Sequence, residues 1–182
     1  MLDMNLRTAR DAVLCCCALA LSASVPTVDA RARTLPPTIT QALSRRYPGW
    51  RLAVPDSDVA DYYARTQNRS AEELCVVRGD FDSNGEADWA IHLLYQHGSE
   101  SERRLLVYLQ RGGRYWLRTV ERGRPDGQFS IHMTPLGSRL YDFQRDRYFR
   151  LRHDALFIYY FEKAGHHFIW RRNRFAIVTT SD

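Results

Sequence analysis

The stretch "RRLLVYLQRGGRYWLRTVE", residues 103–121, places two adjacent glycines between two strand-like segments. Gly112 and Gly113 can adopt positive φ without a steric penalty, and a two-residue hairpin turn requires that conformation. The flanking segments 103–110 and 114–121 are therefore predicted to pair as antiparallel strands. This hairpin indicates that the chain around it is built from antiparallel β-sheet.

Similar short segments follow one another along most of the chain, with a hydrophobic repeat of two and turn residues between them. Further strands are predicted at residues 73–79, 88–96, 128–133, 138–143, 155–162, 166–170 and 174–180. Asn173 is a candidate for positive φ in the last turn, because asparagine tolerates that conformation. Residues 97–104 are predicted to form a mobile polar loop. Short strands with tight turns favour an antiparallel sheet over alternating strands and helices.

The region before these strands has a helical repeat instead. Residues 38–47 are predicted to form a helix that stops at the Pro-Gly pair 48–49, because proline cannot continue the helical hydrogen bonds. Residues 50–54 are predicted to be a short strand, whereas residues 56–68 fit either a helix or a polar loop. The predicted fold class is α+β, with a short N-terminal helix packed on an antiparallel β-meander sheet.

The segment 1–32 has the order of a secretory signal peptide. Basic residues come first, and the apolar run 12–25 after them is shorter than the ~20 residues of a membrane span. Small residues follow, and cleavage is expected after Ala30 or Ala32. A lipoprotein signal is less well supported, because Leu14 rather than a small residue precedes the cysteines. A retained membrane anchor is disfavoured by the short run.

Residues 33–182 are predicted to be a single secreted α+β domain, since about 150 residues is a usual size for one domain. Cys75 is the one cysteine of this part, so a monomer would contain no disulfide. We expect its thiol to be buried in a strand as a small apolar group. The expected state is a monomer without a transmembrane segment, and the expected location is secreted or periplasmic.

The chain is basic, with 26 Lys and Arg against 21 Asp and Glu, and Lys163 is its only lysine. Arginine binds phosphates and carboxylates bidentately, although a compositional bias of the genome would also place arginine where lysine is usual. An exported basic domain meets envelope polymers and acidic proteins before nucleic acid. The expected partner is therefore an unknown protein or an anionic envelope component, and nucleic acid is disfavoured.

The segment "GDFDSNGEADWAI", residues 79–91, has the spacing of a calcium loop. Oxygen-bearing side chains alternate along it, a glycine allows the sharp turn, and a backbone carbonyl supplies a further ligand. The predicted calcium ligands are Asp80, Asp82, Asn84, the carbonyl of Glu86, and Asp88. Ile91 stands where an EF-hand has its glutamate, and the flanks are strands, so an EF-hand is disfavoured. The competing interpretation is a polar turn whose side chains accept backbone amides without metal.

This segment resembles the loop of FG-GAP and VCBS-type repeats, whose motif "G-D-F-N-G-D-G-x-x-D-L-A" joins two strands around calcium. The resemblance implies the side-chain ligands Asp80, Asp82, Asn84 and Asp88. It does not imply a propeller, because a propeller repeats the motif in each blade. The chain also resembles a group of uncharacterised bacterial secreted or periplasmic proteins with "YPGW" (47–50), "GDFDxNGxxD" (79–88) and a C-terminal "YFEKA…W…F" meander (160–175). That second resemblance implies a fold rather than an activity.

The sequence contains no nucleophile elbow, zinc-protease helix, phosphate-binding loop or dinucleotide-binding motif. His166 and His167 are adjacent in a predicted strand, so their side chains point to opposite faces and cannot hold one ion together. The sequence therefore predicts a non-catalytic secreted or periplasmic binding or envelope-associated protein with a structural calcium loop. The alternative is a small secreted enzyme, a hydrolase, with an unrecognised site.

Aromatic and arginine side chains meet near the C-terminal end of the predicted meander. Such combinations are common on protein recognition surfaces. The predicted partner-binding residues are Tyr160, Trp170, Arg171, Arg172 and Arg174. The competing interpretation is that the aromatic residues pack in the core and on the sheet faces.

Overall fold

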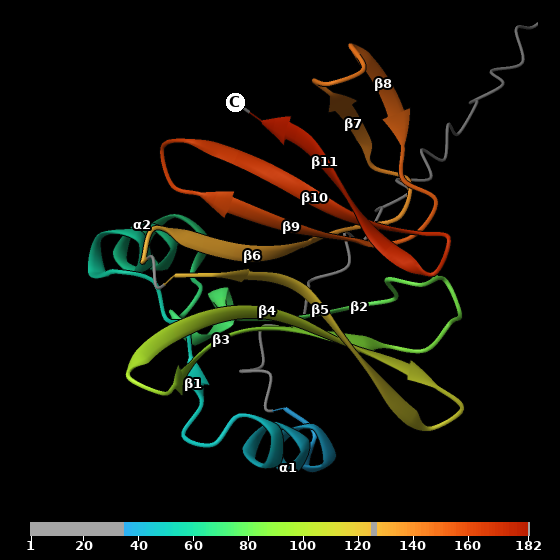
Figure 1. Cartoon of the computed structure of the whole chain (residues 1–182). Coiled ribbons are helices and arrows are strands. Elements are labelled where there is room, and N and C mark those ends of the chain that lie inside the picture. Colours follow the sequence, from blue (N-terminus) through green and yellow to red (C-terminus); the bar gives the residue numbers. More distant parts are fainter. Residues whose placement is uncertain (1–34, 125–126, 182) are drawn as a thin grey trace, which may run out of the picture.

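The computed structural model describes residues 35–124 and 127–181, which form antiparallel sheets accompanied by two α-helices (Figure 1). The predicted signal peptide and its cleavage sites lie outside the described residues. Among the described helices, none is long and apolar enough to cross a membrane. The coarse prediction of a β-rich α+β chain is confirmed.

The N-terminal half alternates short helices with the first strands. Its elements are α1 (Pro37–Arg46), β1 (Arg51–Leu52), α2 (Ser57–Gln67), a 3-10 helix η1 (Glu72–Leu74), β2 (Val76–Gly79), β3 (Asp88–His97), β4 (Glu100–Arg111) and β5 (Arg114–Gly123). The C-terminal half consists of strands. These are β6 (Phe129–Thr134), β7 (Arg139–Asp142), β8 (Arg147–Arg150), β9 (Ala155–Tyr160), β10 (Ala164–Arg171) and β11 (Arg174–Ser181).

The first sheet has the order β1-β3-β4-β5, and β2 also pairs with β3. The hairpin of β4 and β5 closes with Arg111 opposite Arg114. Gly112 and Gly113 between them have φ of 56° and 74°, as the sequence predicted for this turn. The strand β5 is the free edge of this sheet on the side away from β1.

The second sheet has the order β11-β10-β9-β6, and the hairpin of β7 and β8 forms a separate two-stranded sheet. Because β6 pairs with β9, the β7–β8 hairpin is an excursion between two strands that lie side by side. The last turn, between β10 and β11, has positive φ at Arg172 and at Asn173, as predicted for the asparagine.

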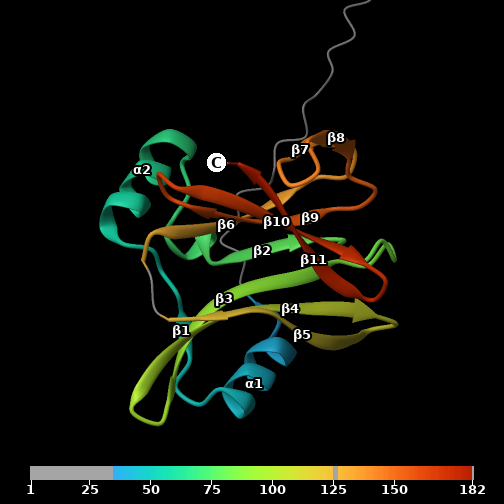
Figure 2. The ribbon, with the colours of Figure 1, turned by 45° about the horizontal axis from the view of Figure 1, so that its top comes forward.

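The two larger sheets face each other and enclose the main core, as Figures 1 and 2 show. Phe81, Leu105 and Leu109 reach this core from the first sheet and its loop, and Phe129 and Phe168 reach it from the second. Each of these side chains is at most 2% exposed. The described residues therefore form two facing antiparallel sheets, with the small β7–β8 sheet and the helices around them.

The helix α1 covers the outer face of the first sheet (Figure 1). Ile39 and Leu43 are fully buried there, and Tyr47 is 4% exposed, since these positions recur on one face of a helix. They pack in one cluster with Trp89 and Leu93 of β3. The predicted contact between an N-terminal helix and antiparallel sheet is present.

Residues 56–68, which fitted two interpretations, contain the helix α2. Val59 and Tyr63 are buried one turn apart and pack with Leu74. Asn68 ends the helix in the left-handed conformation, with φ of 51°.

The prediction of one meander sheet was wrong, because the strands divide between two larger sheets and a hairpin. Residues 97–104 are not a loop, since β3 and β4 stay paired up to His97 opposite Glu100. The segment predicted as strand 73–79 begins with η1 and becomes extended at Val76. The strand β8 was not predicted.

The buried position predicted for Cys75 is confirmed, since this free cysteine is 0% exposed. Burial raises the pKa of its thiol to about 12, with a smaller contribution from the carboxylate of Glu72. A thiol with that pKa is protonated at neutral pH and is a poor nucleophile.

Candidate functional site

The loop between β2 and β3 is anchored at its start by a core side chain and by a carboxylate from a distant segment. Phe81 is fully buried and fixes the start of the loop in the main core. Asp154, from the connection between β8 and β9, accepts a hydrogen bond from the amide of Asp80 at 2.9 Å. Ser83 and Gly85 have φ of 63° and 82°, which curls the chain between them. The carboxylates of the loop are thereby turned toward one another.

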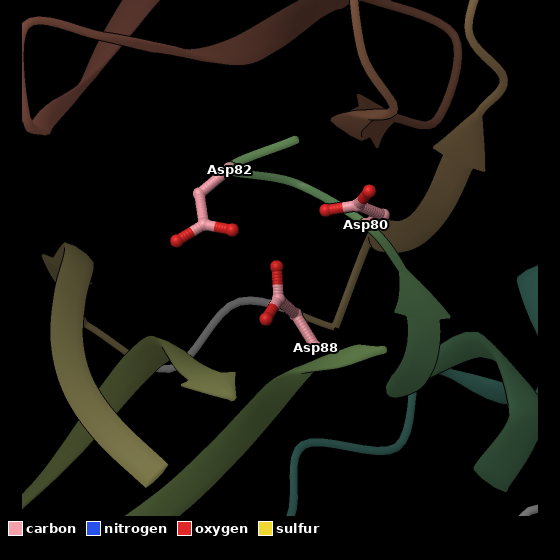
Figure 3. A group of neighbouring side chains, drawn as sticks. All are labelled: Asp80, Asp82 and Asp88. Carbon is pink, nitrogen blue, oxygen red and sulfur yellow. The ribbon is translucent and has the colours of Figure 1, made fainter. Parts of the chain in front are cut away.

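Three carboxylates converge in this loop, those of Asp80, Asp82 and Asp88 (Figure 3). One oxygen of each lies within 4.8 Å of the others. Asp88 is 0% exposed, and the Asp82 side chain is 2% exposed. This group can hold a metal ion, as its spacing in the sequence predicted.

Two of the three carboxylates also accept backbone amides. Asp80 accepts the amides of Asn84 at 3.0 Å and Gly85 at 2.9 Å. Asp88 accepts one amide from its own loop and the amide of Gln110 in β4, each at 2.8 Å. These are the contacts of a polar turn, but each carboxylate oxygen has a second lone pair that a cation can use.

The third carboxylate, Asp82, has a different environment. Its Oδ2 accepts a hydrogen bond from Nε of Arg111 at 2.7 Å, and Nη2 of that arginine lies at the same distance. Its Oδ1 is buried and has no hydrogen-bond partner among the described residues. A buried oxygen without a partner is unfavourable, and a cation in the loop would satisfy it.

The side chains of Asn84 and Glu86, the other two predicted ligand residues, bind the neighbouring hairpin, although the ligand predicted at Glu86 was its backbone carbonyl. Asn84 donates from Nδ2 to the carbonyl of Gln110 at 2.7 Å, and its Oδ1 accepts the amide of Glu86 at 2.7 Å. The carboxylate of Glu86 accepts the amide of Gly112 at 2.8 Å. The structure therefore brings three of the five predicted ligand residues together, and the side chains of Asn84 and Glu86 fasten the loop to the β4–β5 turn.

Burial raises the pKa of Asp88 to about 7. The amides of Gln110 and Phe81 oppose this rise, and the charges of Asp82 and Asp80 add to it. The three negative charges of this cluster repel one another, and a divalent cation between the carboxylates would stabilise their charged forms.

The predicted partner-binding residues divide between two places. Trp170 lies at the β10–β11 end, packs against the main core, and has the guanidinium of Arg111 5.8 Å from its ring centroid. Arg171 has its guanidinium 5.8 Å from the ring of Phe149, on the side of the β7–β8 hairpin. Arg172 and Arg174 are exposed in and beside the turn. These four residues are neighbours.

Tyr160 is not part of that group, and the prediction of a shared surface was wrong for it. It lies at the other end of β9, opposite Ala164, and packs against the main core. Its hydroxyl donates to Oε1 of Glu121 at 2.9 Å. Burial is the largest cause that raises its pKa to about 12, and the charge of Glu121 adds to it.

A hollow of about 700 Å³ lies beside the β10–β11 turn, on the side of the β7–β8 hairpin. It is lined by Phe149, Arg150, Leu151, Arg152, His153, Ile169, Trp170, Arg171 and Arg172. No described carboxylate is within ion-pair distance of its four arginines. The lining therefore combines aromatic rings with uncompensated positive charge.

One contact that resembles catalytic chemistry was not predicted from the sequence. Nε2 of His132 lies 2.7 Å from Oγ of Ser130, because alternate residues of β6 share a face. Its Nδ1 lies 2.7 Å from a guanidinium nitrogen of Arg69, and burial is the main cause that lowers the His132 pKa to about 3. Ser130 is 0% exposed. A general base needs a higher pKa, an orienting acceptor and access to substrate, and this pair has none of them.

The fold and the site together define a two-sheet antiparallel β protein with a carboxylate loop and an arginine-aromatic end. Comparisons of the chain with family models, with curated proteins and with solved structures find no match.

Proposed function

We propose that this protein is an exported, non-catalytic binding protein, and that it works as a monomer in a secreted or periplasmic location. The observation that carries the proposal is the convergence of unpaired arginines with aromatic rings at one end of the two-sheet structure. The order of basic, apolar and small residues in segment 1–32 supports export.

The docking surface of this proposal consists of Trp170, Arg171, Arg172 and Arg174, together with the hollow of about 700 Å³ beside them. Guanidinium groups bind carboxylate and phosphate oxygens bidentately, and they do so most strongly when no internal carboxylate competes. The partner we propose is an acidic protein or an anionic envelope component. Nucleic acid is disfavoured by the proposed location.

The carboxylate loop has a structural role in this proposal and binds one calcium ion. Calcium is proposed because its ligands are oxygen atoms and its coordination is flexible. Asp80, Asp82 and Asp88 would supply carboxylate oxygens, and Asn84 and the carbonyl of Glu86 would complete the set by small rotations. The loop touches both β4 and the connection after β8, so an ion there would stiffen the end that carries the arginines.

A hydrolytic function is less well supported by the arrangement of titratable groups. Cys75, Ser130 and His132 do not line the hollow of Trp170. His153 does line it, but no described serine, threonine, cysteine or carboxylate lines the hollow beside that imidazole. Ser130 and Cys75 are fully buried. A hydrolase that uses a protein nucleophile would need that nucleophile beside its base, where the substrate can reach both.

The docking surface can be tested with heparin, a soluble sulfated polyanion. The double variant Arg171→Glu with Arg172→Glu should elute from immobilised heparin at clearly lower salt than the wild type. Retention of the wild type should also weaken steeply as salt is raised, because exposed charges are then more strongly screened. The control is Arg45→Glu with Arg65→Glu, which makes the same change of net charge on the exposed faces of α1 and α2.

If both double variants elute together, net charge alone explains retention and the docking surface lies elsewhere.

Export is tested separately by the intact mass of the protein recovered from the producing cells. A mass that begins after Ala30 or Ala32 agrees with the proposal, whereas a mass that includes Met1 contradicts it.

A further inference from the structure

A second hollow, of about 600 Å³, lies on the other side of the β10–β11 turn. It is lined by Arg111, Gly112, Arg114, Trp116, Arg118 and Asn173. The β4–β5 hairpin supplies all of these residues except Asn173, which belongs to the turn. Neither the calcium loop nor the proposed docking surface accounts for this hollow.

The register of the hairpin explains why these side chains meet. Arg114, Trp116 and Arg118 are alternate residues of β5, so they point to one face of the strand. Arg111 is paired with Arg114 across the turn and shares that face. The cross-strand partners of these β5 residues include Leu109 and Val107 of β4, which are buried in the main core, so the row lies on the core-facing side of the first sheet at its free edge.

Trp116 is the exposed apolar component of the hollow, with 52% of its surface accessible. The neighbouring side chains of β5, Tyr115 and Leu117, instead pack with the cluster beneath α1. A large indole ring left open between two arginines offers a flat face for a ring-shaped ligand. Leu109, which pairs with Trp116 across the two strands, is fully buried, so the ring lies at the margin of the core and not inside it.

The charge of the hollow is also largely uncompensated. Arg111 has the carboxylate of Asp82 as its partner, and that contact holds its guanidinium at the rim. Arg118 makes a hydrogen bond to the carbonyl of Leu117, and no described carboxylate lies within ion-pair distance of Arg114 or Arg118. Three guanidinium groups around one hollow repel one another, and an oxyanion between them would relieve that repulsion.

We propose that Arg111, Arg114 and Arg118 bind the phosphate of a small ring-bearing phosphate ester, and that Trp116 stacks on its ring. Guanidinium groups match the phosphate oxygens in pairs. The ring comes from a sugar or from a nucleobase, and the two sources share this chemistry. This site goes beyond the docking surface and does not require calcium in the loop.

Isothermal titration at low salt, in chelator, tests the site with glucose 6-phosphate, adenosine monophosphate, inorganic phosphate and glucose. The two phosphate esters should bind more tightly than inorganic phosphate, and glucose should not bind. A sugar site will favour glucose 6-phosphate, and a base site will favour adenosine monophosphate. If inorganic phosphate binds as tightly as both esters, the stacking role of Trp116 is wrong.

Two variants separate the two contacts. Arg114→Gln should weaken both esters and inorganic phosphate by about tenfold, the effect of losing a hydrogen bond to a charged group. Trp116→Ala should weaken the esters by several-fold and leave inorganic phosphate unchanged. Arg122→Gln is the matched control, because this exposed arginine lies at the other end of β5 and should leave all affinities unchanged.

The proposal is overturned if no ester binds at millimolar concentration, or if Arg114→Gln and Arg122→Gln have the same effect. Such a result would leave the docking surface of Arg171 and Arg172 standing, because that surface lines the other hollow. The converse outcome is that the wild type binds the esters as expected while Arg171→Glu with Arg172→Glu leaves heparin retention unchanged. That pair of results would contradict the docking surface and support this site.

Discussion

Asp82 connects the carboxylate loop with the arginine and aromatic side chains at this end of the molecule. One of its oxygens binds Arg111, and the other is buried without a partner among the described residues. Arg111 in turn lies over the ring of Trp170 and lines the hollow of Trp116. A single carboxylate therefore belongs to the proposed metal loop and orients an arginine that lines one hollow and lies over Trp170, which lines the other.

His167 gives a prediction about acid stability at the scale of one residue. Burial lowers its pKa to about 4, from an ordinary value of 6.5. Between these values the unfolded chain binds a proton that the folded chain does not, so stability falls as pH falls from 6.5 toward 4. Below pH 4 this contribution is fully lost. His167→Gln should reduce the loss over that window by up to about 3 kcal/mol.

Urea unfolding of wild type and His167→Gln at several pH values measures this difference. Glutamine can still bond with Thr134 and Thr180, which contact the two ring nitrogens of His167. Parallel curves of unfolding free energy against pH for the two proteins would show that His167 does not titrate differently on folding.

The residue contacts that sequence could predict are the local ones. The spacing of Asp80, Asp82 and Asp88 indicated their convergence, because one short loop carries all three. The contacts of Asp82 with Arg111 and of Asp80 with Asp154 were not predictable, since each joins segments that are distant in sequence. The distant Arg111 determines which carboxylate oxygen of Asp82 is left without a hydrogen bond.

At the scale of elements, α1 contributes a compact hydrophobic contact. Ile39 and Leu43 are fully buried against the first sheet, although the helix is short. A short helix has little stability of its own in water, so its packing on the sheet determines whether it forms.

Leu43→Ala should therefore destabilise the protein by about 2–5 kcal/mol, the usual effect of truncating a buried leucine. Gln41→Ala, on the exposed face of the same helix, should change stability by less than about 0.5 kcal/mol. Chemical unfolding of the two variants makes the comparison. Equal stabilities of the two variants would mean that α1 does not pack on the sheet in solution.

The strands that were predicted correctly have a hydrophobic repeat of two, as in 88–97 and 114–123. The strand β8 was missed because its ends are arginines and its side chains are mostly exposed. The paired tip of β3 and β4 was missed because it extends beyond the core, where polar side chains need not alternate with apolar ones. Side-chain bonds such as those of Glu102 with Tyr95 and Arg104 support the tip, but they join polar groups and leave no alternation of apolar and polar residues in the sequence.

At the scale of the whole molecule, the division into two sheets was not predictable from periodicity. A repeat of two identifies a strand but not its neighbour, and β6 pairs with β9 across the β7–β8 hairpin. The division matters for the proposed sites because it places the β4–β5 and β10–β11 turns at one end (Figure 1). The loop of Asp80, Asp82 and Asp88 lies against the same end, bonded to Gln110 and Gly112.

Thermal unfolding in millimolar calcium and in chelator tests the calcium loop most directly. Binding to the folded chain alone should stabilise it by about 1.4 kcal/mol at a calcium concentration tenfold above Kd. For a domain of this size the melting temperature should rise by about 2–5 °C. Asp82→Asn should abolish the rise, whereas Asp61→Asn, an exposed carboxylate on α2, should retain it. A wild-type melting temperature that is the same in calcium and in chelator would show that the loop is a polar turn without metal.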